Sequence, residues 1–338
     1  MELTPIHQAQ RLEAPAPLEQ VLEVSRANAL LCRDHHLIRL GDTALLETGE
    51  WRYNGEAGLL SRHSLAQLCS RLELPGGGTV PAGYLSRCPE VLAAENLNHW
   101  LQGWKCRDRR VFVRTKEAAT TGPQVRAVLS DRYAVADHRV LLEALCELVP
   151  RYDLVLQAWS LDDEQLTVRL SARGEHPVSL RDPLRIGVHI SNSEIGLGRI
   201  AITALITRLV CTNGLVVKAA DLGGIHRRHI GRAGEDLETV IRSGMGKVLE
   251  EADVACRRFV RLREEPAPSP VDEFVRTSVK RYDLPERVGP LALQHLAGET
   301  LYDVVNAFTR AAQTFPVHER LQIETTMSQF LRGDPAKN

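Results

Sequence analysis

The sequence predicts an α+β protein with a central antiparallel sheet, packed helices and a helical C-terminal region. Apolar residues alternate with period two through the middle of the chain and return to a helical period toward the end. Strands and helices do not alternate as βαβ units, so a doubly wound nucleotide-binding sheet is not expected. The 338 residues, 43% hydrophobic and 25% charged, have the composition of a globular protein with one large domain or two.

Residues 1–60 are predicted to form a small N-terminal α/β element. Apolar residues at helical spacing predict a helix over 18–31, and the next segment has the pattern of a hairpin turning at Gly41 and Asp42. Two further helices are expected over 64–72 and 90–104, separated by the glycine-rich loop at 76–78. This loop lacks the GK[ST] ending of a phosphate-binding loop and does not follow a strand.

Residues 61–263 are predicted to form the central α+β domain. Alternating apolar residues predict strands over 111–116, 124–131, 153–161, 165–172, 183–192 and 199–211. A helix capped by Asp137 and closed by Pro150 is expected among them, and a long charged helix over 234–263. The Pro-rich segment 264–272 predicts a linker, followed by a helical C-terminal region over 273–332.

Charge is unevenly distributed along the chain. The formal net charge is −1, which lacks the signature of a generally basic nucleic-acid-binding protein, yet residues 105–139 hold nine Lys or Arg against four acids. No apolar run is long enough to span a bilayer and the first residues lack a secretory signal, so we expect a cytoplasmic protein with no membrane contact. The seven cysteines show no CxxC spacing, which argues against a disulfide framework and a zinc site.

The segment RAVLSDRY, residues 126–133, ends a predicted strand on a polar turn. Arg126 and Arg132 could pair with phosphates while Tyr133 offers a ring for stacking on a base. The structural alternative is a local turn in which Ser130 and Asp131 bond nearby backbone amides. The nucleic-acid interpretation therefore depends on guanidinium groups that face outward and are not neutralised by neighbouring acids.

A second polar segment, HISNSEIGLGR at 189–199, is followed by GIHRRHIG at 224–231. The histidines and arginines of the latter favour an anion site over a zinc site. A catalytic alternative would combine Glu194, Asp131, His226 and His229 in a metal-dependent nuclease or phosphoesterase. Signatures of other enzymes, such as GxSxG, HExxH and GxxxxGK[ST], are absent.

The same segments resemble a known family. AQLCSRLELP and YLSRCPEVLAAENLNHWL, then VRAVLSDRYAVADHRVLLEAL, then RIGVHISNSEIGLGRIAITALITRLVCTNGLVV, are similar to the phage and plasmid proteins grouped as domain of unknown function 932. The resemblance covers about residues 60–325. It implies a context of mobile DNA and supplies no activity. At the level of fold, a sheet with a basic stripe is also similar to Rad52-type single-strand annealing proteins.

Together these patterns favour a non-catalytic protein that binds single-stranded nucleic acid, with DNA the expected ligand and with no cofactor or metal. Strand annealing by a homo-oligomer is a further expectation. The alternatives are the nuclease and an oligomeric interaction scaffold. An apolar stripe in the C-terminal region is expected to pack within the chain and could alternatively form the scaffold's interface: Tyr302, Val305, Phe308, Ala312 and Phe315. The candidate nucleic-acid-binding residues are Lys105, Arg107, Arg109, Arg110, Arg114, Arg126, Arg132, Tyr133, Asn192, His226, Arg227, Arg228 and His229.

Overall fold

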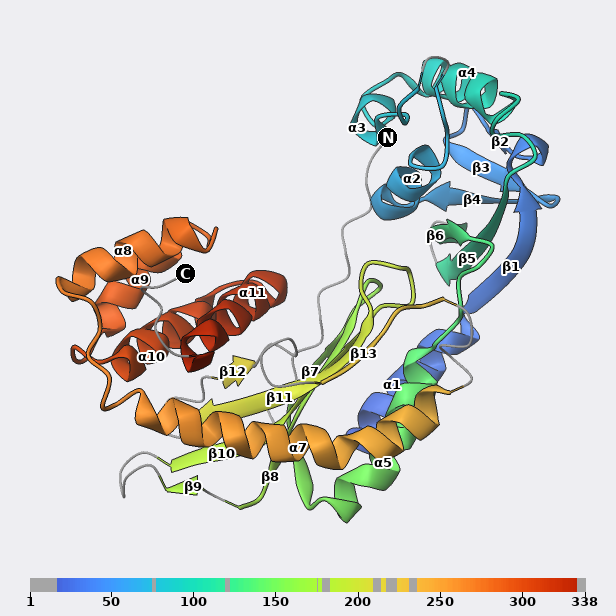
Figure 1. Cartoon of the computed structure of the whole chain (residues 1–338). Coiled ribbons are helices and arrows are strands. Elements are labelled where there is room, and N and C mark those ends of the chain that lie inside the picture. The colour runs from blue at the N-terminus through green and yellow to red at the C-terminus, as the bar shows by residue number, and fades with distance from the viewer. Residues whose placement is uncertain are drawn as a thin grey trace.

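Two β-sheets, the helices packed on them and a group of C-terminal helices make up the part of the protein that the computed structural model describes (Figure 1). The structure describes residues 17–74, 77–118, 122–174, 176–177, 183–208, 214–216, 224–230 and 236–332. The predicted α+β class is confirmed, and both sheets are almost entirely antiparallel. Parts of the expected elements, residues 1–16, 76, 209–211, 234 and 235, lie outside the described residues.

The first sheet has the strand order β1-β5-β6-β4-β3-β2. Strands from residues 32–60 and 110–130 share it, so one layer is built from both sides of the predicted boundary at residue 60. One face packs around Trp51, Tyr53 and Leu97 beneath α2 (Arg62–Cys69), α3 (Ala82–Leu85) and α4 (Glu90–Leu101). The strands are β1 (Cys32–Arg39), β2 (Ala44–Leu45), β3 (Glu50–Tyr53), β4 (Glu56–Leu60), β5 (Arg110–Ala118) and β6 (Gly122–Ser130).

The hairpin expected at Gly41 and Asp42 is wrong. Strand β1 pairs with β5, and β2 pairs with β3. Residues 40–42 form a short 3-10 turn whose amides bond to another segment: Leu40 N donates to Arg109 O at 3.0 Å and Gly41 N to Arg107 O at 2.9 Å. These long-range hydrogen bonds replace the local pairing that a hairpin would need.

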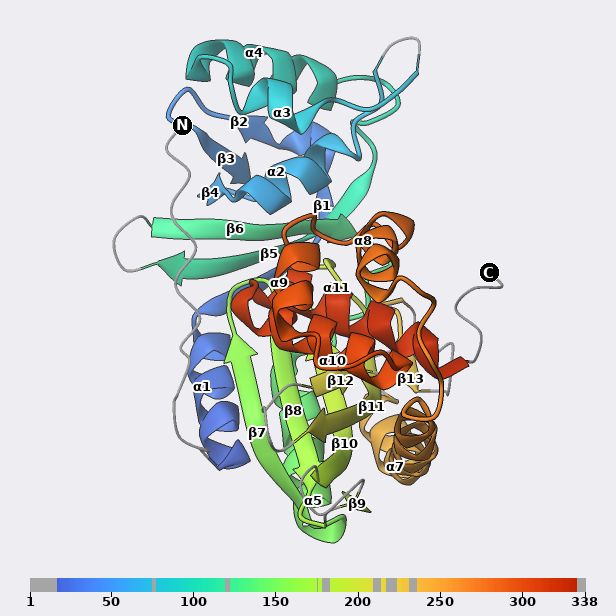
Figure 2. The same ribbon diagram turned by 90° about the vertical axis from the view of Figure 1, so that its left-hand side faces the viewer.

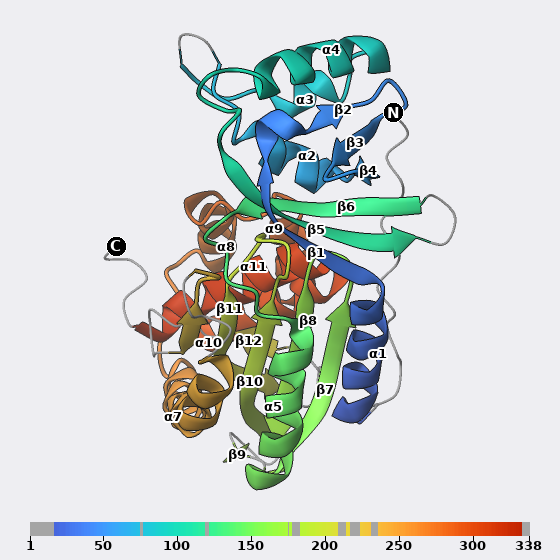
Figure 3. The same cartoon turned by 90° about the vertical axis from the view of Figure 1, so that its right-hand side faces the viewer.

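The second sheet contains the four strands predicted over 153–211 and is covered on one face by three helices (Figure 3). Val188, Ile190 and Ile202 belong to the large core that this face shares with α1 (Leu18–Leu30), α5 (His138–Arg151) and α7 (Leu237–Arg261). The path through the sheet is β12-β11-β10-β8-β7. Its strands are β7 (Leu154–Leu161), β8 (Leu166–Ala172), β9 (His176–Pro177), β10 (Pro183–Asn192), β11 (Ile200–Arg208), β12 (Gly214–Val216) and β13 (Ile225–Arg227).

The predicted helical C-terminal region is confirmed and lies over the opposite face of the second sheet (Figures 1 and 2). The Pro-rich segment 264–272 is hydrogen-bonded to residues in the middle of this region, with Ala267 N donating to Glu299 O and Leu301 N to Glu265 O. The helices are α8 (Val271–Arg281), α9 (Val288–His295), α10 (Leu301–Ala311) and α11 (Val317–Met327). The apolar stripe proposed as an interface is buried within the chain, as shown by Tyr302, Val305, Phe308, Ala312 and Phe315.

Gly187 lies in the middle of β10, where a Cβ would be 2.0 Å from Leu170 O and 2.8 Å from Ser171 Cα. Because backbone atoms cannot move aside cheaply, we expect Gly187→Ala to lower the free energy of unfolding by about 3 kcal/mol. Urea denaturation measures this. Gly83→Ala is the matched control, since nothing lies within 4 Å of a Cβ there. Equal stability of the two variants would contradict the close packing at Gly187.

Candidate functional site

The candidate residues fall into three groups, and the first group lies inside the molecule between the two sheets. Arg114 of β5 is 3% exposed. Its Nε donates to Asp34 Oδ1 at 2.8 Å, its Nη2 to Asp137 Oδ1 at 2.7 Å, and its Nη1 to Glu194 O at 3.1 Å. Two carboxylates and a carbonyl therefore satisfy this guanidinium, and the expectation that it faces a ligand is wrong.

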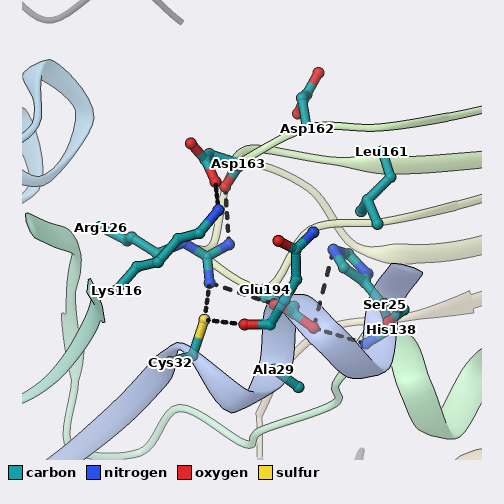
Figure 4. Close-up of a pocket in the computed structure, with 11 residues that line it drawn as sticks. Ser25, Ala29, Cys32, Lys116, Arg126, His138, Leu161, Asp162, Asp163 and Glu194 are labelled. Atoms are coloured by element: carbon teal, nitrogen blue, oxygen red, sulfur yellow. Dashed lines mark hydrogen bonds and ion pairs between the residues drawn. The ribbon is translucent and has the colours of Figure 1, made fainter. Parts of the chain in front are cut away.

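Arg126 of β6 is also enclosed by protein and is 6% exposed, although its Nε has no hydrogen-bond partner among the described residues. Arg114 pairs with Ala127 and Thr115 with Val125, so Arg126 is an extra residue in a β-bulge, a feature that re-aims a side chain. Its Nη2 donates to Asp163 O at 2.9 Å and its Nη1 lies 3.5 Å from Glu194 Oε2 (Figure 4). The outward orientation expected for Arg126 is therefore wrong as well.

Glu194 connects this network to the second half of the molecule. Its Oε1 accepts a hydrogen bond from the backbone N of His138 at 2.8 Å, at the first residue of α5. Asp137 occupies the N-cap position, as predicted, but makes no side-chain cap hydrogen bond. A carboxylate 56 residues away in sequence thus satisfies an unpaired amide and faces the positive end of the helix dipole.

Asn192 and His138 complete the interior part of the network. Asn192, 1% exposed, donates through Nδ2 to Ala136 O at 2.9 Å and contacts His138 Nδ1 at 3.1 Å. The nucleic-acid contact expected for Asn192 is therefore wrong, because its side chain is enclosed by protein. Since the amide group is a donor here, the neutral imidazole of His138 carries its proton on Nε2.

A cavity of about 20 Å³ lies beside this network, lined in part by Cys32, Lys116, Arg126, Asp163 and Glu194 (Figure 4). A space of this size holds one water molecule. Lys116 Nζ bonds Asp163 Oδ1 at 2.6 Å, and Arg126 Nη1 lies 3.1 Å from Cys32 Sγ. Burial raises the pKa of the Cys32 thiol despite these cations, so the cavity does not present an activated thiolate nucleophile.

The residues of the metal-dependent alternative do not come together. Glu194 is engaged with Arg126 and the start of α5, whereas Asp131 is exposed on the turn after β6. His229 Nδ1 lies 3.3 Å from Ala134 O, and its ring stacks on Tyr133. Within the part of the chain that the structure describes, no group of three or more His, Cys, Asp or Glu side chains could hold a metal ion.

The second group of candidates lies at the surface, where three segments meet: 130–134, 196–201 and 225–230. Tyr133 forms a β-bridge with Ile230, and Ile200 pairs with Arg227. Arg132, Arg199 and Arg228 are exposed, and none of them has an ion-pair partner among the described residues. We call these three residues, with exposed His226, the arginine surface. Asp131 is the one acidic residue in the sequence of these three segments.

Besides burial, the positive charge of the arginine surface lowers the pKa of His226. Burial and the positive charge of Arg199 lower the pKa of His226, which places these two side chains in one electrostatic environment. Arg227 is half-buried and pairs in register with Ile200. Arg199 was missed in the sequence, because the turn that carries it is placed beside β13 only by strand pairing.

A stack of four rings lies behind the arginine surface. His36 stacks on Phe112 at 4.5 Å, Phe112 on Tyr133 at 6.0 Å, and Tyr133 on His229 at 5.0 Å between ring centroids. His36 is exposed, whereas His229 is 5% exposed. Tyr133 is stacked between Phe112 and His229, so the base stacking expected of it is wrong. The ligand contact expected of His229 is wrong because its ring is buried. His36 was not predicted from the sequence as part of this stack.

The remaining candidates lie near the start of β5 and are exposed. Lys105 pairs with Glu73, Arg107 lies 3.5 Å from Asp108, and Arg109 donates to Arg71 O. Arg110 pairs in register with Arg39, and the next residue, Val111, pairs with Ser130, where the segment 130–134 begins. The basic residues of 105–139 therefore do not form one surface: Arg132 belongs to the second group, whereas Lys105, Arg107 and Arg109 lie near the start of β5.

The chain is therefore an α+β protein in which a charged interior network joins two sheets and an arginine surface lies at their junction. It belongs to the family described as a domain of unknown function (DUF932), whose model matches residues 125–313. No curated protein and no solved structure matches the chain. No helix among the described residues is long and apolar enough to cross a membrane.

Burial lowers the pKa of His138 to about 4, below the roughly 6.5 of an unfolded histidine. Between these values the unfolded chain binds more protons, so stability falls as the pH falls from about 6.5 to about 4. We expect the free energy of unfolding of the wild type to fall about 3 kcal/mol more than that of His138→Asn over this range, in urea titrations at fixed pH. His318→Asn, at an exposed position, is the control. Parallel pH profiles for wild type and His138→Asn would contradict the assignment.

Proposed function

We propose that this protein is a cytoplasmic, non-catalytic protein that binds single-stranded nucleic acid, with DNA as the expected ligand. The observation that supports this proposal is the arginine surface: Arg132, Arg199 and Arg228 are exposed from adjacent segments and lack carboxylate partners among the described residues. Guanidinium groups bind phosphate through parallel hydrogen bonds. A local excess of positive charge can therefore attract a polyanion although the whole chain has a net charge of −1.

Apolar side chains beside the arginines favour a single strand over a duplex. Ile230 is 61% exposed and Leu197 is 49% exposed. Ile230 bridges to Tyr133, and the turn that carries Leu197 approaches the Tyr133 ring at Gly196. Unstacked bases offer flat apolar faces that such side chains can cover, whereas a duplex presents mainly phosphate and sugar at its surface.

Four further expectations stay predictions: strand annealing, the relation to Rad52-type proteins, a phage or plasmid context, and homo-oligomerisation. The apolar stripe on α10 does not support an interface, because Val305 and Phe308 are fully buried within one chain. Light scattering of the full chain with and without an oligonucleotide would measure its stoichiometry.

Fluorescence anisotropy with a labelled single-stranded oligonucleotide tests the arginine surface. In the triple variant Arg132→Gln, Arg199→Gln, Arg228→Gln we expect affinity to fall at least roughly tenfold at low salt. The slope of log K against log salt should decrease by about two, because each phosphate contact on a single strand contributes about 0.7.

The matched control removes three exposed arginines elsewhere: Arg52→Gln, Arg87→Gln and Arg276→Gln. Both triple variants lose the same net charge, so only a local site distinguishes them. Absence of binding by the wild type at low salt would remove the proposal, and an equal loss in both variants would assign binding to net charge and not to this surface.

A further inference from the structure

The second sheet has a polar face on the side opposite α5 and α7. The alternate residues of its central strands are Thr167, Arg169 and Ser171 on β8, His189 and Ser191 on β10, and Thr203 on β11. Arg169, His189 and Thr203 are cross-strand neighbours and form one row. Such a row is unusual beneath a layer of helices, because burying polar groups costs free energy unless each has a partner.

Helix α11 covers this row with a carboxylate. Glu324 is fully buried, and its Oε1 and Oε2 accept hydrogen bonds from Arg169 Nη1 at 3.3 Å and Nη2 at 2.5 Å. Arg320 Nε donates to the same carboxylate at 2.9 Å. The planar, two-point contact between Arg169 and Glu324 is the geometry in which arginine also binds phosphate.

Other groups on the polar face are left without partners by this arrangement. Neither ring nitrogen of His189, which is 3% exposed, has a hydrogen-bond partner among the described residues, and Ser171 Oγ is also unpaired. Burial and the charges of Arg169 and Arg320 lower the pKa of His189 well below its usual value, so the ring is neutral and has one donor and one acceptor. Glu324 thus satisfies Arg169 while its neighbours in the sheet remain unsatisfied.

The polar face leads to the arginine surface. Along β11 the side chain of Thr203 is followed on the same face by Ala201, which pairs with His226, and Arg199 comes just before the strand. Ser191 pairs with Ala201 and with Thr167. A chain bound at Arg199 could therefore continue along the sheet toward His189 and Arg169 if α11 were displaced.

We propose that the polar face of the second sheet is a masked extension of the arginine surface, and that Glu324 of α11 occupies the place of a nucleic-acid phosphate on Arg169. This inference rests on the proposed function. In the closed form, α11 competes with the ligand for Arg169. In the open form, a single strand would contact Arg169 and give His189 and Ser171 polar partners.

The variant Glu324→Gln keeps the shape of the side chain and removes the charge that competes with phosphate. We expect it to bind a labelled oligothymidine about tenfold more tightly than the wild type, within the usual range of coupling between two sites. Glu319→Gln is the matched control: it removes the same charge from the same helix, where Glu319 pairs with Arg287. It should bind within about twofold of the wild type.

Hydrogen exchange of the wild type gives a second measurement that does not depend on a variant folding. At saturating oligothymidine we expect amides of residues 317–327 to exchange at least roughly tenfold faster and those of 185–191 to exchange more slowly. Unchanged exchange in α11 overturns the inference, as does equal affinity of Glu324→Gln and Glu319→Gln when the wild type binds. If neither the wild type nor Glu324→Gln binds, the proposed function fails and the inference fails with it.

Discussion

The burial of Arg114 and Arg126 between the two sheets is the constraint on which the rest of the structure depends. A buried guanidinium must be neutralised and hydrogen-bonded, and removing one partner of such a pair costs about 3–5 kcal/mol. The partners come from three places in the sequence: Asp34 on β1, Asp137 before α5 and Glu194 after β10. Because each carboxylate must reach its arginine, the network fixes how the first sheet, α5 and the second sheet are arranged.

The network also fixes the position of the arginine surface. Ile195, in the turn after β10, packs with Phe112, Ala127 and Leu129 of the first sheet in a small apolar cluster. Apolar packing alone therefore gives the two sheets little common area. Gln67 of α2 adds two polar ties, accepting from Val128 N and donating to Ile195 O, both at 2.8 Å. Val128 and Ile195, which make these hydrogen bonds, come shortly before the segments 130–134 and 196–201. The interior network therefore positions the two segments that carry the exposed Arg132 and Arg199.

The periodicity of apolar residues predicted most of the helices and strands, but it did not predict which strands pair with one another. The alternation through 183–208 predicted β10 and β11, because their apolar face is continuous and buried. The pairing of β1 with β5, about 80 residues apart, has no local signal. In the site, the inward direction of Arg126 results from one extra residue in β6, which shifts the alternation of side chains. A stretch of alternating residues cannot show a bulge until the partner strand is known.

Two buried arginine–glutamate pairs in this chain therefore have different physical roles. Glu194 accepts from the amide of His138 as well as contacting Arg126, so its removal would leave a helix end and a buried cation unsatisfied. Glu324 accepts hydrogen bonds only from side chains, those of Arg169, Arg320 and Gln313, among the described residues, and Arg320 lies on the same helix. A phosphate in the place of this carboxylate would give Arg169 the same kind of charge-assisted, two-point contact that Glu324 gives it. A polyanion that could not displace Glu194 could thus displace Glu324.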